Sequence, residues 1–210
     1  MAEKFDLKIE DGKNVFLTSD SHFFHENIIH FSHRPFNNVD EMNSVMIDNW
    51  NSKVPPDGLV FHLGDFAWGG YPKWREIREQ LNGDIILIEG NHDRKNLTSA
   101  GKLLFSDVVQ QMRICIENRP VWLNHFPFLC YSGTYRDFKG LEFQAYGHVH
   151  SGHYAGNSGK DSNRLSVCFP TQYDVGVDNN EFAPISWHEL NEKIIRQIEE
   201  SKNDKNNDSA

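Results

Sequence analysis

The chain has 210 residues, with 21 Lys and Arg against 30 Asp and Glu, which gives a formal net charge of −9. This acidic balance argues against a broad electrostatic grip on extended nucleic acid or on an anionic membrane surface. No apolar run approaches the length needed to cross a bilayer, and residues 1–6 lack the apolar core of a signal peptide. The three cysteines have no C-x-x-C spacing and are typical of reduced cytosolic thiols. We therefore expect a cytoplasmic protein without a membrane partner.

The length suits one domain with a sizeable core, and the pattern shows no internal repeat or interdomain linker. Residues 1–201 are expected to form this single domain. Residues 202–210 are polar and lack periodicity, so a disordered tail is expected there. The pattern indicates no particular oligomeric state.

Short apolar runs bounded by Gly, Asn and Asp predict five buried strands in the first 150 residues. The runs cover residues 15–17, 59–63, 85–88, 121–123 and 143–146. Three helices are predicted around them from capping residues and from apolar stripes at helical spacing. The first follows Asn38, the second begins near Pro72 and stops at Gly83, and the third opens with the capping pair Ser186 and Glu189.

The later segments Asp107–Glu117, Arg164–Phe169 and Tyr173–Val177 alternate between apolar and polar residues, and we expect them to be antiparallel strands. The chain order is strand, helix, strand, helix, strand, followed by a mostly β second half. This order predicts an α/β fold in which two stacked, mixed sheets are flanked by helices.

Each of the five buried runs ends in residues that can bind a metal. They are Asp20 and His22; Asp65; Asn91, His92 and Asp93; His125; and His148 and His150. In layered α/β folds the chemistry lies just beyond the carboxyl ends of the strands, so these residues are expected to converge on one site. A set of Asp, His and Asn without Cys indicates metal chemistry.

The ligand types and their spacing are compatible with two cations. Asp20 and His22 are two residues apart, so on an extended chain both side chains point the same way, and His148 and His150 repeat this spacing. The Asp65 carboxylate can bridge two cations about 3.5–4 Å apart, and such a pair suits phosphoryl transfer. The mixed nitrogen and oxygen ligands favour Mn, with Fe, Zn, Ni or Mg as alternatives, and the imidazoles argue against an all-Mg site.

The ordered motifs carry a family resemblance. They are Asp20-x-His22, Gly64-Asp65, Gly90-Asn91-His92-Asp93, a lone His125, and Gly147-His148-x-His150. Each motif alone is a weak signal, but the full set in this order, each after a strand, resembles the calcineurin-like metallophosphoesterase superfamily. The resemblance spans residues 15–150, and the segments 22–28, 34–36 and 175–186 are similar to small bacterial and phage members. It implies a single-domain, four-layer α/β/β/α sandwich.

The resemblance implies seven metal ligands in two groups that share one carboxylate. The first cation would be held by Asp20, His22 and His150, the second by Asn91, His125 and His148, and both by Asp65. His92 would face the leaving group as general acid or transition-state donor. Asp93 would orient His92 through its ring N–H. A metal-bridging hydroxide would attack phosphorus.

The sequence departs from the family pattern after Gly64-Asp65. Many relatives have a second acid a few residues later, where this chain has Phe66, Ala67 and Trp68. The aromatic pair Phe66 and Trp68 is expected to shape the pocket instead.

Several of these residues have alternative interpretations. Taken singly, Asp20, Asp65 and Asn91 would be turn residues at strand ends, but the paired histidines at both ends of the motif set favour the metal site. His25 and Arg34 are candidate substrate contacts, because Arg suits bidentate phosphate binding. For these two residues the alternative is an ordinary surface turn.

Two polar loops, residues 128–140 and 151–163, directly follow motifs and are expected to take part in substrate recognition. Arg94 and Arg136 either line the cleft or are solvated side chains. Among the remaining histidines, His153 is the strongest candidate for a role at the site because it closely follows the last motif.

The leading functional hypothesis is a binuclear-metal phosphohydrolase, namely a phosphodiesterase acting on small or nucleotide phosphodiesters. Compact motif spacing indicates no inserted cap domain, so an open cleft would admit both diesters and monoesters. A phosphomonoesterase acting on small molecules or nucleotides is the close alternative. A catalytically silent binding or scaffold protein would be marked by missing ligands, and none is missing here. The acidic charge argues against processive action on long nucleic acid.

Overall fold

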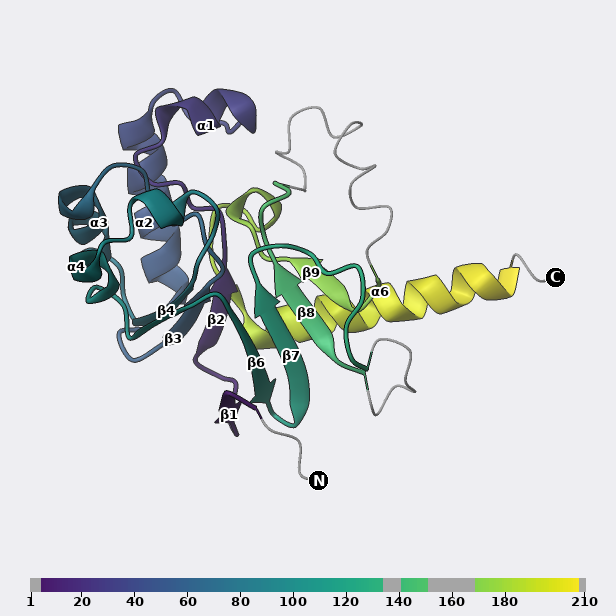
Figure 1. The fold of residues 1–210 in the computed structure, drawn as a ribbon. Helices are drawn as coiled ribbons and strands as arrows, with labels where there is room; N and C mark the ends of the chain where they lie inside the picture. Colours follow the sequence, from purple (N-terminus) through teal and green to yellow (C-terminus); the bar gives the residue numbers. More distant parts are fainter. Residues whose placement is uncertain (1–4, 134–140, 151–168, 208–210) are drawn as a thin grey trace.

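The computed structural model describes residues 5–133, 141–150 and 169–207. Within these residues the chain forms two five-stranded sheets that share one hydrophobic core, with most helices gathered on one side (Figure 1). The α-helices are α1 (Glu26–Phe31), α2 (Val39–Lys53), α3 (Tyr71–Arg78), α4 (Ser99–Lys102) and α6 (Trp187–Asn207). An α/β sandwich is therefore present, as the sequence predicts.

The first sheet consists mainly of parallel strands. Its members are β2 (Val15–Thr18), β3 (Leu59–His62), β4 (Asp84–Ile88), β5 (Asp107–Val109) and β10 (Ile185–Ser186). The strand order is β10-β2-β3-β4-β5, in which only the edge strand β10 runs antiparallel to its neighbour. The carboxyl ends of β2, β3 and β4 consequently meet at one edge of the sheet.

The second sheet is mixed and has the order β1-β6-β7-β8-β9. Its members are β1 (Leu7–Ile9), β6 (Gln111–Ile116), β7 (Arg119–Asn124), β8 (Phe143–Tyr146) and β9 (Gln172–Asp174). Only β6 and β7 pair antiparallel, through the tight turn at Glu117 and Asn118, while the other neighbours are parallel.

The expectation of antiparallel strands in the second half is wrong in two places. The predicted strand Asp107–Glu117 divides at Gln110 into β5, which runs parallel to β4 in the first sheet, and β6, which belongs to the second. The strand predicted at Tyr173–Val177 is β9, and it pairs parallel with β8. Alternation along a strand reports which face is buried and not the direction of the neighbouring strand. Most of the predicted strand at 164–169 lies outside the described residues.

The predicted helix starts are confirmed by their capping contacts. The Asn38 side chain accepts the backbone N–H of Glu41 at 2.9 Å, and Ser186 and Glu189 form a reciprocal capping box. The helix ends differ from the prediction. Helix α3 stops at Arg78, several residues before Gly83, and α6 continues to Asn207 through part of the segment expected to be a disordered tail.

The first sheet is buried on both faces, as parallel sheets generally are. One face packs against α1, α2 and α3, where Val60, Ile85 and Leu87 meet side chains such as Trp50 and Trp74; these belong to one apolar cluster. The opposite face packs against the second sheet and forms the shared core. The long helix α6 contributes to that shared core and contacts β2, β9 and β10. It therefore contacts strands of both sheets.

Over the described ranges, no helix combines the length and the apolar character needed to cross a bilayer.

Leu123 on β7 is completely buried between the sheets, whereas Leu103 is 86% exposed. We expect Leu123→Ala to lower the free energy of unfolding by about 2–5 kcal/mol, because it leaves a cavity in the shared core. Leu103→Ala is the matched control and should change it by less than about 0.5 kcal/mol. Urea denaturation followed by circular dichroism measures both values. Similar losses in the two variants would contradict the burial of Leu123.

Candidate metal centre

The five loops that follow β2, β3, β4, β7 and β8 meet at one end of the sandwich and bring the motif residues together. The loops supply, in chain order, Asp20 and His22; Asp65; Asn91, His92 and Asp93; His125; and His148 and His150. Convergence occurs because parallel neighbouring strands end at the same edge of their sheet. The geometry therefore brings the residues of these five strand ends together.

Asp20, His22 and His150 form one group of side chains that could hold a metal ion. Their ligand atoms all lie within 4.8 Å of one another. Asp20 Oδ1 is 4.0 Å from His22 Nε2 and 3.7 Å from His150 Nε2. Asp20 Oδ1 and His22 Nε2 are buried and have no hydrogen-bond partner among the described residues. Buried polar atoms are normally satisfied, so this pair of open atoms fits a cation that binds both.

Asp65, His125 and His148 form a second such group, and the amide of Asn91 joins it. His125 Nδ1 lies 2.7 Å from the Leu63 carbonyl oxygen and therefore carries the proton. This contact leaves His125 Nε2 as an acceptor, 2.9 Å from Asn91 Oδ1. Two acceptors facing each other at this distance suit a cation between them, and fixing one ring nitrogen by a carbonyl is typical of metal-binding histidines.

The carboxylate of Asp65 lies between the two groups. Its Oδ2 is 3.6 Å from His22 Nε2 in the first group and 3.5 Å from His125 Nε2 in the second. Its Oδ1 accepts the backbone N–H of His92 at 2.8 Å, which fixes the orientation of the carboxylate. Burial raises the pKa of Asp65 to about 7, so its anion needs compensating positive charge. A position between two cations would provide that charge.

The histidines of the first group differ in their protonation. Burial, followed by the nearby His150 and Arg34, lowers the pKa of His22 well below its usual value, so its ring is neutral and able to coordinate a metal. Burial also opposes charge on His150, but its hydrogen bond to Asp178 and the nearby Asp20 carboxylate raise its pKa to about 9. A metal ion at this group would therefore displace a proton from His150.

Five of the candidate ligand residues adopt left-handed backbone conformations. The φ angles are 56° at Asp20, 50° at His22, 57° at Asp65, 72° at His148 and 47° at His150. Such angles are uncommon for residues other than glycine and are concentrated at functional sites. The expectation that the Asp-x-His and His-x-His pairs lie on extended chain is thus wrong. Their side chains meet because tight loops turn them inward.

Two motif glycines are required by close packing. A side chain at Gly147 would collide with Ser19 Oγ and Asp20 Oδ2, and one at Gly90 would collide with Asp65 Oδ1. Both glycines thus allow the backbone of one loop to approach a candidate ligand on another.

The Asp93 carboxylate is held by the backbone of two loops. It is buried and accepts three backbone N–H groups, from Asp65 at 2.8 Å, Phe66 at 3.0 Å and Gly90 at 2.8 Å. Both oxygens are therefore engaged, and the described contacts include no hydrogen bond from the His92 ring to Asp93. Asp93 joins the loops after β3 and β4 and so positions Asp65.

Arg34 lies in the interior and is not part of a surface turn. Its side chain is buried and makes a bidentate ion pair with Asp178, with N–O distances of 2.8 and 2.9 Å. It also donates to the backbone carbonyl oxygens of Asp20 and Ser21. The same Asp178 accepts Nδ1–H of His150 at 2.8 Å. Sequence analysis assigned no role to Asp178, although it lies in a segment that carries the family resemblance.

A cavity of about 360 Å³ opens beside the two ligand groups. It is lined by His22, His25, Ile28, Phe31, Ser32, His92, His148, Val149 and His150. The side chain of His92 is 42% exposed, and its Nε2 is 3.9 Å from Asp65 Oδ2. His92 and His25 therefore both face this cavity.

The predicted aromatic pair after Asp65 is only partly at the pocket. Phe66 is fully buried and packs against Phe23 and Trp74 in the core beneath the helices. Trp68 is 44% exposed and stacks on His25. Of the two, Trp68 alone lies beside the cavity, where it contacts the lining residue His25.

Arg94 does not line the cavity beside the ligand groups. Arg94 lines a separate hollow of about 320 Å³ with Glu89, Asn124 and Phe126, and the Phe126 ring contacts the rings of His125 and His148. Arg136, His153, the loop 151–163 and most of the loop 128–140 lie outside the described residues.

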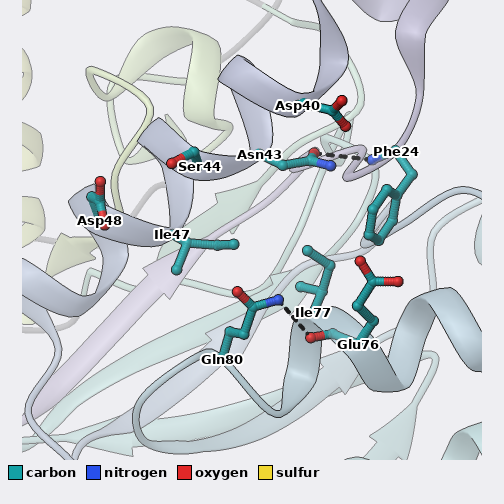
Figure 2. Close-up of a pocket in the computed structure, with 9 residues that line it drawn as sticks. All are labelled: Phe24, Asp40, Asn43, Ser44, Ile47, Asp48, Glu76, Ile77 and Gln80. Carbon is teal, nitrogen blue, oxygen red and sulfur yellow. Dashed lines mark hydrogen bonds between the residues drawn. The ribbon is translucent and has the colours of Figure 1, made fainter.

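Another hollow, of about 270 Å³, lies between α2 and α3 (Figure 2). Asp40, Asp48 and Glu76 give it an acidic lining, and Phe24 is held at its edge by a hydrogen bond to Asn43. It contains none of the candidate ligands and is distinct from the metal centre.

Comparisons with known proteins give little functional information. No model of a known protein family matches the chain. A stretch of 84 residues is 46% identical to the uncharacterized protein MJ1445 of Methanocaldococcus jannaschii. This stretch covers 39% of this chain and 48% of that protein. The chain thus spans about half the length of the curated relative it matches.

Solved structures define the fold more clearly. The protein of unknown function AQ665 from Aquifex aeolicus has a TM-score of 0.62 and 24% identity, covering 85% of this chain and 97% of that one. The two chains share a fold. Nuclease MPE from Pseudomonas putida has a TM-score of 0.38 and 16% identity over 66% of this chain and 61% of its own, a likeness too low to support an argument.

The contact between Asp178 and His150 generates a prediction about metal affinity. We expect the protein to bind two Mn²⁺ ions per chain, and Asp178→Asn to weaken one of them by about 10–100-fold, because His150 loses the partner that orients its ring. Isothermal titration calorimetry with Mn²⁺ measures both sites. Asp40→Asn, in the separate acidic hollow, is the control. Unchanged binding by Asp178→Asn would contradict this positioning role.

Proposed function

We propose that this protein is a metal-dependent phosphohydrolase of the calcineurin-like metallophosphoesterase type, and specifically a phosphodiesterase for small or nucleotide phosphodiesters. The observation that carries the proposal is the position of Asp65 Oδ2, within 3.6 Å of a histidine from each of two ligand groups. A buried carboxylate shared by two groups is typical of a binuclear centre.

The side chains present suit two divalent cations. The first would be held by Asp20, His22 and His150, the second by Asn91, His125 and His148, and both by Asp65. Bound cations of this kind supply an acidified water and neutralise charge on phosphoryl oxygens. The nitrogen and oxygen ligands without thiolate favour Mn, with Fe, Zn, Ni or Mg as alternatives.

The chain's own residues orient the reaction. Asp93 and the His92 backbone N–H fix the Asp65 carboxylate, and Asp178 fixes the His150 ring. Burial lowers the pKa of His92, so its ring is neutral in the free protein. A phosphoester anion beside it would raise that pKa and favour the imidazolium, which can donate a proton or hydrogen bond to the departing oxygen.

The charge of the cavity supports a diester over a monoester. A phosphomonoester carries more negative charge than a diester and profits more from a basic partner. Among the described residues that line the cavity there is no Lys or Arg, and Arg34 is engaged by Asp178. Phosphomonoesterase activity remains the alternative function. A silent binding protein is disfavoured because every side chain expected in the two ligand groups is present.

The function is tested with p-nitrophenyl esters in the presence of Mn²⁺. We expect faster hydrolysis of bis(p-nitrophenyl) phosphate than of p-nitrophenyl phosphate, because the described lining of the cavity offers no Lys or Arg for the second monoester charge. Asp65→Asn should lower kcat by about 100-fold or more while the protein stays folded, on the scale of losing a preorganised electrostatic contact. The exposed Asp48→Asn is the control. Release from the monoester alone would instead indicate a phosphatase.

The role of His92 is tested by changing the leaving group. We expect His92→Asn to lower kcat by about 10²–10⁴-fold on diesters with a poor leaving group and far less on p-nitrophenyl esters, because only the former need a proton donor. The exposed His188→Asn is the matched control. Equal losses on both kinds of ester would argue against proton donation by His92.

A further inference from the structure

We propose that an aromatic wall beside the metal centre, formed by His25, Phe31 and Trp68, binds a planar ring of the substrate, so that the substrate is an aromatic phosphodiester such as a nucleotide ester. This inference rests on the proposed function and specifies its substrate class. None of the three side chains belongs to the candidate ligand groups.

The wall exposes aromatic surface in and beside the cavity, because His25 and Phe31 line it and Trp68 stacks on His25. Trp68 is 44% exposed and Phe31 is 72% exposed, although both are large aromatic residues. The rings of His25 and Trp68 stack almost parallel, with centroids 4.5 Å apart and an angle of 11°, and Phe31 meets His25 edge-on at 6.4 Å. Neighbouring exposed aromatics that continue from a cavity are typical of a ligand-binding surface.

The wall is held in place by the loops that carry the metal centre. The backbone N–H of Trp68 donates to the Phe23 carbonyl oxygen at 2.7 Å, and Phe23 also pairs with Ala67 in an isolated parallel bridge. These contacts join the loop after β2, which continues to His25, to the loop after β3. The stacked pair of His25 and Trp68 is therefore formed before any ligand binds, which reduces the entropy cost of binding.

The wall adjoins the leaving-group side of the proposed site. The ring of His92 lies 5.8 Å from that of Trp68 and 6.3 Å from that of His25. The ring of His22, a candidate ligand, lies 5.3 Å from that of His92 and also 5.3 Å from that of His25. A phosphoryl group at the metal centre would thus have both His92 and the aromatic wall as neighbours on this side.

The chemistry of the wall favours a flat, weakly charged ring. Aromatic side chains stack on any nucleobase, because every base has a π-face. The cavity volume of about 360 Å³ lies near the lower end of the range for ligand pockets, which fits one ring system together with a phosphate and not a long polymer.

The test compares two phosphate monoesters of ribose, one with a nucleobase and one without. We expect adenosine 5′-monophosphate to inhibit hydrolysis of bis(p-nitrophenyl) phosphate about tenfold more strongly than ribose 5-phosphate does, because the base stacks on the wall. Trp68→Leu should remove most of this advantage by weakening only the nucleotide. Calorimetry of both ligands with the Mn²⁺-loaded protein gives the same comparison without turnover. Phe31→Leu provides a second variant, and Phe5→Leu, on a remote edge, is its matched control.

The outcomes separate this inference from the proposed function. Equal affinity of the wild-type protein for the two ligands, or an unchanged preference in both Trp68→Leu and Phe31→Leu, would overturn the aromatic wall even if diesters are hydrolysed. A wild-type protein that hydrolyses no ester would overturn the proposed function, while calorimetry would still decide on the wall. Phenyl phosphate distinguishes the two kinds of aromatic substrate. If it binds as tightly as the nucleotide, the substrate is an aryl ester; if it binds more weakly, the substrate is a nucleotide ester.

Discussion

The site depends on one buried carboxylate, that of Asp65, which lies at nearly the same distance from a histidine of each ligand group. Its Oδ2 lies 3.6 Å from His22 Nε2 and 3.5 Å from His125 Nε2. These histidines come from different sheets, so the position of Asp65 requires the two sheets to be stacked in one register. The shared core between the sheets therefore sets the distance between the two ligand groups as well as the stability of the fold.

Buried polar groups around the site convert this stacking into a defined geometry. Asp93 accepts backbone N–H groups from two loops of the first sheet, and Arg34 joins Asp178 to the backbone at Asp20. A buried ion pair is weak evidence for stability, because desolvation offsets most of its attraction. Its contribution here is orientation, since Asp178 also fixes the ring of His150. Left-handed residues within the same loops are maintained by these contacts.

Some parts of this arrangement were predictable from local sequence. The capping residue Asn38 and the pair Ser186 and Glu189 specify helix starts through contacts three residues away, and those predictions are confirmed. The division of residues 107–117 between two sheets was not predictable. Each half has a similar alternating pattern, and only pairing with distant strands decides which sheet it joins.

Local sequence specifies which side chains are available for chemistry, because Asp, His and Asn at the ends of apolar runs must lie at the edge of a sheet. The contacts that several of them make depend on how distant segments pack together. Arg34 and Asp178 are 144 positions apart, and Asp93 contacts groups on a different loop, so no local pattern specifies these bonds. Burial is the physical reason, because a charged group removed from water must pair with the polar groups that the fold places beside it. For Arg34 that partner is a carboxylate that supports the site.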